Sequence, residues 1–108
     1  MVVLVLRGLT GTAMAAGVER DRIWLDPGVG FGKTPAHNLA LLAALPRFVA
    51  LGYPILLGAS RKRFIAGLDP SAGEATDRLG GSLAAHLAGA AAGVAAVRVH
   101  DVRETVQA

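Results

Sequence analysis

The sequence predicts an α/β fold in which parallel strands alternate with helices. Three short apolar runs of strand type, at residues 23–25, 55–57 and 94–99, are separated by longer segments with helical spacing or helix-capping residues. Each run is apolar throughout instead of alternating with polar residues, which is typical of strands buried on both faces. Together these two observations favour parallel βα units.

The first predicted helix occupies the start of the chain. Apolar residues recur at helical spacing from Val2 to Ala16, and Gly17 is placed to end the helix. The run at 2–6 is rich in β-branched residues, which leaves a strand open as the alternative there. The first strand is predicted at 23–25, between a charged turn and a polar, glycine-rich loop.

A second helix is predicted to follow that loop. Thr34 and Pro35 are suited to be its N-cap and first helical residue, and the pattern runs to about Leu51. Pro46 is expected to kink or split the helix, because proline cannot donate a backbone hydrogen bond. The second strand, at 55–57, then ends at a glycine.

The rest of the chain continues the alternation. We expect the following elements: a loop or short helix from 60 to 63, a turn-rich connection at 68–73, a long helix from Glu74 to about Ala92 ended by Gly93, a strand at 94–99, and a last helix that opens with a capping box at 101–104.

Composition limits the class of protein. The 108 residues correspond to one domain or part of one, and 53% are hydrophobic, so a packed core is expected. The net charge of +3 comes from basic residues dispersed among acidic ones, which disfavours nucleic-acid binding. The absence of cysteine excludes disulfides and thiolate metal sites.

Two apolar stretches, at 1–7 and 79–97, bear on membrane association, and neither predicts it. The opening seven residues are too short for the apolar region of a signal peptide. Residues 79–97 carry no formal charge but consist mostly of alanine and glycine, so they are expected to form a buried helix and strand instead of a membrane span.

Polar residues and glycines gather after each predicted strand. The three clusters lie at 26–33, 58–62 and 98–101. In parallel α/β folds the carboxyl ends of the strands share one edge, and active sites lie at that edge. Ordinary turn chemistry would explain the glycines equally well, but it explains Lys62, Arg98 and His100 poorly.

The first cluster resembles nucleotide-binding loops only loosely. A phosphate-binding P-loop needs a glycine five positions before Gly32, and that position holds Pro27. The glycines at 28, 30 and 32 have the spacing GxGxG instead of the dinucleotide-binding GxGxxG. A nucleotide-binding module that uses Gly28–Lys33 therefore stays only as an alternative.

Lysine usage singles out one residue. The chain has nine arginines and two lysines, Lys33 and Lys62, and both lysines lie in the clusters. Because an ammonium group and a planar guanidinium are not interchangeable, Lys62 is a candidate for contact with a ligand. A solvated surface side chain is the simpler reading for Lys33.

Three further residues are candidates for binding. Asp26 directly follows a buried strand, where it could accept two N–H donors from a heterocycle or simply close an Asx turn. Arg98 and His100 are two residues apart on a strand, so they share a face and could both meet a phosphate. His37 and His86 are predicted to be structural, and the three histidines lack metal-ligand spacing.

Taken together, the three clusters resemble one family, the dihydropteroate synthases. The motifs are Asp-Pro-Gly-Val-Gly-Phe-Gly-Lys at 26–33, Gly-Ala-Ser-Arg-Lys at 58–62 and Arg-Val-His-Asp-Val at 98–102, supported by Arg-Leu-Gly-Gly-Ser at 78–82 and by His37-Asn38. The resemblance runs from about residue 12 to residue 108, whereas residues 1–7 match only loosely.

The resemblance implies a (β/α)₈ barrel of which this chain forms the last three strands, about three βα units. It implies condensation of 6-hydroxymethyl-7,8-dihydropterin diphosphate with 4-aminobenzoate, which releases pyrophosphate, in folate biosynthesis. A cytoplasmic enzyme, a target of sulfonamides, is implied with it.

Site residues are carried over by their matching positions. Asp26 would bind the pterin ring and Lys62 its polar edge, while Phe31 and Gly58 would line the pterin and aminobenzoate pockets. Ser60 would lie near the aminobenzoate carboxylate, and Arg98 and His100 would contact the diphosphate. Lys62, Arg98 and His100 are thus the expected catalytic residues.

The resemblance also implies partners and a cofactor. Mg²⁺ is implied, with its protein ligand expected in an N-terminal part that these residues do not include, and a homodimer or other self-association is expected. Residues 1–108 would then be a single partial pterin-binding barrel domain, truncated at the N-terminus and within the last helix. A non-catalytic half-barrel that serves as an interaction piece is the other alternative.

Overall fold

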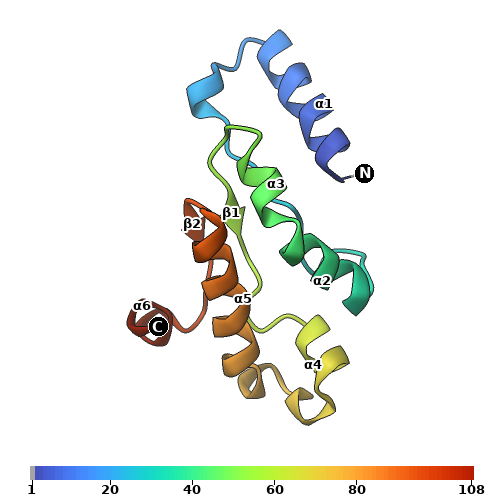
Figure 1. The fold of residues 1–108 in the computed structure, drawn as a ribbon, viewed down its shortest axis with the longest axis vertical. Helices are drawn as coiled ribbons and strands as arrows, with labels where there is room; N and C mark the ends of the chain where they lie inside the picture. Colours follow the sequence, from blue (N-terminus) through green and yellow to red (C-terminus); the bar gives the residue numbers. More distant parts are fainter. Residues whose placement is uncertain (1) are drawn as a thin grey trace.

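A computed structural model describes residues 2–108, apart from the side chains of residues 3 and 4. Its helices and strands are, in chain order, α1 (Val2–Ala15), η1 (Arg20–Arg22), α2 (Pro35–Ala43), α3 (Leu45–Val49), β1 (Leu56–Leu57), α4 (Phe64–Leu68), η2 (Pro70–Ala72), η3 (Ala75–Asp77), α5 (Leu79–Ala92), β2 (Ala96–Val97) and α6 (Val102–Gln107) (Figure 1).

The predicted α/β class is confirmed by a small parallel sheet. β1 pairs in parallel with β2, with Leu57 opposite Val97. On its other side, Leu25 forms a single parallel bridge with Ile55. The segment at 55–57 is therefore central, and the three chain segments lie in sequence order, as successive βα units require.

The strands are shorter than the sequence predicts. Of the expected strand at 94–99 only β2 is formed, and the expected strand at 23–25 is reduced to the bridge at Leu25. The outer segments each pair on one side only among the described residues, which limits the ladder hydrogen bonds available to them. Trp24, between two buried neighbours, is 53% exposed.

Most helices begin and end where local chemistry predicts. Residues 2–15 form a helix and not a strand, and Gly17 follows with φ of 99°. The Thr34 hydroxyl accepts the His37 N–H at 3.2 Å, as expected of an N-cap. The proline at 46 splits the predicted long helix into α2 and α3.

One predicted helix start and one predicted capping interaction are wrong. α5 begins at Leu79 and not at Glu74, because the Arg78 guanidinium holds the carbonyls of Ala72 and Gly73 at 2.8 and 2.6 Å and so keeps that stretch in 3₁₀ turns. Asp101 is the N-cap of α6, but its side chain makes no capping hydrogen bond, since it pairs with another side chain instead.

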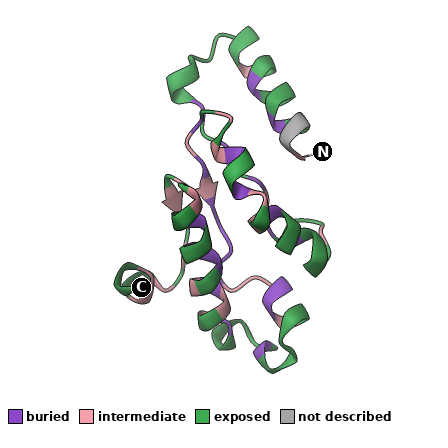
Figure 2. Cartoon of the chain, viewed as in Figure 1, coloured by how far each residue is buried: buried purple, intermediate pink, exposed green. Residues whose placement is uncertain are grey.

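The core gathers between the sheet and the helices α3 and α5 (Figure 2). Leu45, Phe48, Ile55 and Leu57 are almost completely buried. α5 approaches β1 closely through Gly89, where an added Cβ would lie 2.5 Å from the Leu57 Cδ2. In the part of the chain that the structure describes, no helix is long and apolar enough to cross a membrane.

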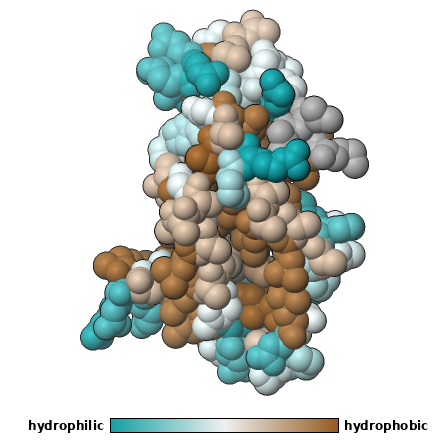
Figure 3. All heavy atoms as spheres, viewed as in Figure 1, coloured by the Kyte–Doolittle hydropathy of each residue, from teal (hydrophilic) through white to brown (hydrophobic). Residues whose placement is uncertain are grey.

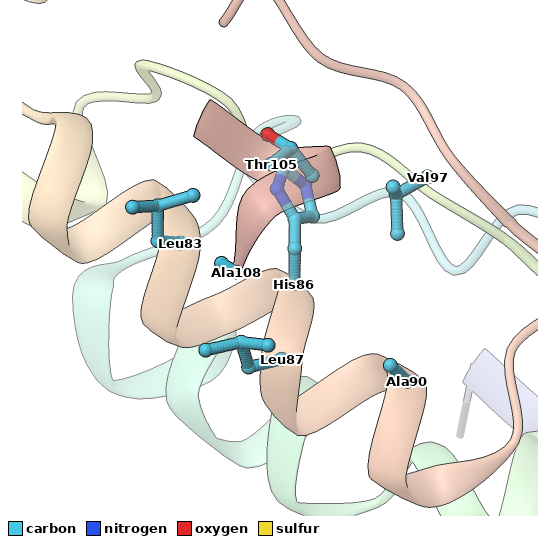
Figure 4. A pocket seen from close by; sticks show the side chains of 7 residues that line it. All are labelled: Leu83, His86, Leu87, Ala90, Val97, Thr105 and Ala108. Carbon is cyan, nitrogen blue, oxygen red and sulfur yellow. The ribbon is translucent and has the colours of Figure 1, made fainter. Parts of the chain in front are cut away.

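His86 joins α5 to the chain that follows β1. Its Nε2 accepts the Ala59 N–H at 3.1 Å, so the neutral ring carries its proton on Nδ1, a buried atom with no hydrogen-bond partner among the described residues. The ring borders a cavity of about 140 Å³ whose other lining residues are uncharged side chains of α5, β2 and α6. Figure 4 shows the ring pointing from α5 toward Thr105. Burial lowers the pKa of His86.

Gly89→Ala should destabilise the chain. A methyl group there collides with a fully buried leucine, and overpacking of this kind costs about 1–3 kcal/mol, more than the better helix propensity of alanine returns. The matched control is Gly80→Ala on the same helix, where an added Cβ meets nothing within 4 Å. Denaturant midpoints should fall for the first variant and rise for the second; a rise for both would contradict the packing of α5 on β1.

His86→Gln should make stability less dependent on pH. Below about pH 6.5 the unfolded chain binds a proton at His86 that the folded chain resists, so the parent loses stability as pH falls from there. Glutamine can still accept the Ala59 N–H but does not titrate. Melting temperatures measured between about pH 7 and about pH 5 should therefore fall less for the variant. An equal fall in both proteins would contradict a buried, neutral His86.

Candidate functional site

The parallel register brings the second and third clusters to one place. A cavity of about 210 Å³ lies beyond the carboxyl ends of β1 and β2, lined by Gly58, Ser60, Lys62, Arg98, Val99 and His100. Five of the seven side chains or glycines predicted from the sequence therefore line one cavity. The other two, Asp26 and Phe31, belong to the glycine-rich loop at 26–33. This loop contacts Lys62, which lines the cavity.

Lys62 connects the first and second clusters. Its ammonium donates to the Val29 carbonyl and lies 4.2 Å from the centre of the Phe31 ring. Its aliphatic stem crosses Gly30, where an added Cβ would overlap it, and φ of 85° at Gly30 also favours glycine. The ammonium is thereby held over the loop at the cavity wall.

Several groups act on the charge of Lys62. Burial lowers its pKa, and the neighbouring charges of Arg98 and Lys33 lower it further, whereas the Asp26 carboxylate opposes them. Lys62 thus lies close enough to two other cations to be repelled by both. Such a cluster favours an anion that carries several negative charges.

Arg98 passes over the loop after β1. Its backbone N–H donates to the Leu57 carbonyl at 2.9 Å, which places the residue at the end of the sheet. An added Cβ at Gly58 would lie 2.8 Å from its Nη2. The glycine at 58 is therefore required for space, and the guanidinium occupies that space.

Ser60 and His100 form a paired contact. The Ser60 Oγ accepts the backbone N–H of His100 at 3.1 Å and lies 2.8 Å from its Nδ1. The direction of the second hydrogen bond follows the tautomer of the ring, because the hydroxyl can donate to Nδ1 or accept from it. The contact holds the imidazole at the wall of the cavity.

Arg61, which the sequence analysis passed over, holds the second and third clusters together. Its guanidinium pairs with Asp101, with Nη2 2.9 Å from Oδ1 and Nε 3.2 Å from Oδ2. The hydrogen bond from Arg61 holds the pKa of Asp101 below its usual range. Such a two-pronged pair orients both groups as well as attracting them.

The backbone of Arg61 adopts the left-handed region with φ of 57°, which is uncommon for a residue with a side chain. Two neighbours stabilise it: the Ser82 Oγ accepts its N–H at 2.9 Å, and Arg78 donates to its carbonyl at 2.9 Å. Its two neighbours in the chain, Ser60 and Lys62, both line the cavity.

The glycine-rich loop uses its backbone amides internally. The Asp26 Oδ1 accepts the Gly28 N–H at 2.8 Å, so the Asx turn is confirmed, while contact between Asp26 and a pterin stays a prediction. The buried Asn38 accepts the Gly30 N–H at 2.7 Å. Amides engaged in this way are unavailable to cradle a phosphate, which disfavours the nucleotide-binding alternative.

Lys33 is not a freely solvated lysine. Its ammonium donates to the carbonyls of Gly28 and Phe31 at 2.7 and 2.9 Å, which closes the loop on itself. His37 is exposed and contributes only a backbone N–H to its helix cap. Neither side chain lines the cavity.

The cavity does not have the donors of a magnesium site. Its lining offers two cationic groups, an imidazole and a hydroxyl, whereas Mg²⁺ prefers carboxylate and other oxygen ligands. Across residues 2–108, apart from the two undescribed side chains, no group of three His, Asp or Glu residues could hold a metal ion. The residues present therefore do not fit magnesium.

The chain is similar to enzymes of one kind over most of its length. It is 49% identical over 100 residues to the dihydropteroate synthase of Mycobacterium leprae, covering 89% of this chain and 35% of that one. It is 46% identical over 104 residues to the enzyme of Neisseria meningitidis serogroup C, covering 95% and 36%. The chain thus spans about a third of the length of these relatives.

Solved structures agree with the sequence relatives. The dihydropteroate synthase of Xanthomonas albilineans in complex with 7,8-dihydropteroate matches with a TM-score of 0.94 at 45% identity, over 98% of this chain and 40% of that one. The enzyme of Thermus thermophilus in complex with 6HMPPP matches with a TM-score of 0.89 at 46% identity, over 98% and 41%.

A family model described as pterin binding enzyme matches residues 3–100 and so includes the cavity and the glycine-rich loop. That match covers most of the chain. Together with the cavity lined by the predicted residues, it shows that the chain belongs to the family of pterin-binding enzymes.

Proposed function

We propose that this chain is the C-terminal part of a dihydropteroate synthase. It would condense 6-hydroxymethyl-7,8-dihydropterin diphosphate with 4-aminobenzoate and release pyrophosphate, in folate biosynthesis. The observation that supports this most is the cavity in which Lys62, Arg98 and His100 meet at the carboxyl ends of two parallel strands. The similarity to dihydropteroate synthases supports the same assignment.

The charges of the cavity suit departure of a diphosphate. In the proposed reaction the bond between the pterin methylene carbon and the diphosphate oxygen breaks, and the amine nitrogen of aminobenzoate forms the new bond to that carbon. Negative charge grows on the leaving oxygen, so fixed cations placed there lower the barrier. The Arg98 guanidinium, the Lys62 ammonium and the His100 imidazole are the groups available for it.

The remaining site residues would position the two substrates. Asp26 would bind the pterin ring, and Phe31, which is 62% exposed beside Lys62, would cover one face of it. Gly58, which leaves room for the Arg98 guanidinium, would line the aminobenzoate pocket, and Ser60 would lie near the aminobenzoate carboxylate. The amine of aminobenzoate is already neutral near neutral pH, so it can attack without a general base, and the proton that its nitrogen loses once the new bond has formed passes to the released pyrophosphate or to solvent.

The chain would supply about three βα units of a (β/α)₈ barrel, with the other strands lying outside these 108 residues. A three-segment sheet has two open edges, whereas a closed barrel has none. Figure 3 shows apolar residues spread over the middle of one face. We therefore propose that the chain self-associates or pairs with the complementary strands. Magnesium, if the complete enzyme uses it, would need ligands outside this cavity.

Addition of a complementary N-terminal segment tests the function. The chain alone should form no dihydropteroate from pterin diphosphate and aminobenzoate. Mixed with residues that supply the other barrel strands of a relative such as the Neisseria enzyme, it should form the product, and light scattering should show a defined complex. A complex without activity would favour the alternative of a non-catalytic interaction piece.

Lys62→Arg and Lys62→Ala, each assayed in the same mixture, test whether activity needs the ammonium group itself or only its positive charge. Arginine keeps the charge, but its planar head group does not reproduce the compact ammonium whose stem packs against Gly30 and which donates to the Val29 carbonyl. Both variants should lose activity to a similar degree, by about tenfold or more. The matched control Arg103→Lys, on the exposed side of α6, should leave activity unchanged. Retention of parental turnover by Lys62→Arg would contradict the proposed role.

A further inference from the structure

The cavity between α5, β2 and α6 contains a buried hydrogen-bond donor without an acceptor. His86 is 3% exposed, and its Nδ1 has no hydrogen-bond partner within the described residues. Because Nε2 accepts the backbone N–H of Ala59, Nδ1 carries the proton of the neutral ring. A buried donor left unpaired is costly, so a ligand atom that accepts from Nδ1 removes that cost.

Thr105 supplies the second polar group of this cavity. Figure 4 shows the His86 ring pointing from α5 toward Thr105 on α6. The Thr105 hydroxyl donates its hydrogen to the Asp101 carbonyl at 2.7 Å, so toward the cavity its oxygen can only accept. The two side chains do not bond to each other. An oxygen placed between them could accept from Nδ1 and donate to Thr105.

This pair of partners selects a hydroxyl group. A hydroxyl accepts through its lone pairs and donates its one hydrogen, both from a single atom. A ketone or an ether has no hydrogen to donate to Thr105. A charged group is disfavoured, because no charged side chain lines the cavity to offset its loss of hydration. The ligand is therefore neutral.

The rest of the cavity selects an apolar body for that hydroxyl. Its volume of about 140 Å³ is close to that of an engineered apolar cavity of about 150 Å³ that binds benzene. A water molecule would satisfy the polar pair but leave the apolar part unfilled. Several lining residues are exposed, so the cavity is open to solvent. The apolar lining consists of Leu83, Leu87, Ala90, Val97 and Ala108.

We propose that this cavity binds a small neutral compound that carries one hydroxyl group on an apolar body of about the size of a benzene ring. The hydroxyl oxygen accepts from the His86 Nδ1 and donates to Thr105, and no covalent bond changes. The site shares no residue with the cavity lined by Lys62 and Arg98. The Ala59 amide, which donates to the same imidazole, reports whether the site is occupied.

The first test compares two ligands of matched shape. Phenol is the probe, and toluene replaces its hydroxyl with a methyl group. Titrated into the ¹⁵N-labelled chain, phenol should shift the His86 Nδ1 and Ala59 amide signals with one saturating midpoint, while α1 should not respond. Phenol should bind severalfold to about tenfold more tightly than toluene, because only phenol forms the two hydrogen bonds.

Two results of this comparison overturn the proposal. If the cavity holds water only, phenol shows no saturable binding. If phenol and toluene bind equally well, the polar pair does not select the ligand. Neither result involves pterin, diphosphate or catalysis, so both are distinct from failure of the proposed function.

The second test locates the site. Ala90→Leu places a larger side chain in the cavity from an exposed helix position and should abolish binding of both ligands. Its matched control is Ala88→Leu, which is exposed on the same helix, does not line the cavity and should keep both midpoints. Melting curves check that both variants are folded. Parental binding of phenol to the Ala90→Leu variant would overturn the assignment of the site.

Thr105→Val tests the acceptor on α6. Valine has nearly the shape of threonine but lacks the oxygen, so the variant should bind phenol severalfold more weakly and toluene as the parent does. An unchanged preference for phenol would overturn the role of Thr105. If this variant does not fold, the comparison of phenol with toluene in the parent chain still decides the proposal.

Discussion

The site depends on the parallel pairing of the segment at 55–57 with its two neighbours. Leu56 donates to the Leu25 carbonyl at 2.8 Å on one side, and Arg98 donates to the Leu57 carbonyl at 2.9 Å on the other. These few backbone hydrogen bonds align three segments that are far apart in sequence, so that their carboxyl ends lie at one edge of the sheet. A shift of one residue would turn alternate side chains to the opposite face and would separate Lys62 from Arg98.

The cavity is also costly to build, because it places like charges together. The glycines at 30 and 58 leave space for the side chains of Lys62 and Arg98, and backbone carbonyls and an aromatic ring surround the ammonium. Arg61 pairs with Asp101, and its backbone N–H donates to Ser82. These contacts stabilise the uncommon backbone conformation of Arg61, between Ser60 and Lys62. A multiply charged oxyanion would relieve the repulsion that this framework maintains.

Local rules predicted the helices, their caps and the place of the site. The Thr34 cap, the split at Pro46 and the stop at Gly93 each follow from one residue and its immediate neighbours. The partners that act over long sequence separation could not be predicted in this way. Arg61 and Asp101 are 40 residues apart, and the contact between His86 and Ala59 spans 27. The late start of α5 likewise depends on tertiary contacts of Arg78, which override helix propensity.

The most direct test is whether the three clusters bind one ligand as a unit. Inorganic pyrophosphate titrated into the ¹⁵N-labelled chain should shift the amide signals at 58–62 and 98–101 together, with the same midpoint. The Val29 and Phe31 amides should follow through Lys62, whereas α1 should not respond. Shifts confined to the glycine-rich loop, or different midpoints for the segments 58–62 and 98–101, would contradict a single site at the carboxyl ends of the strands.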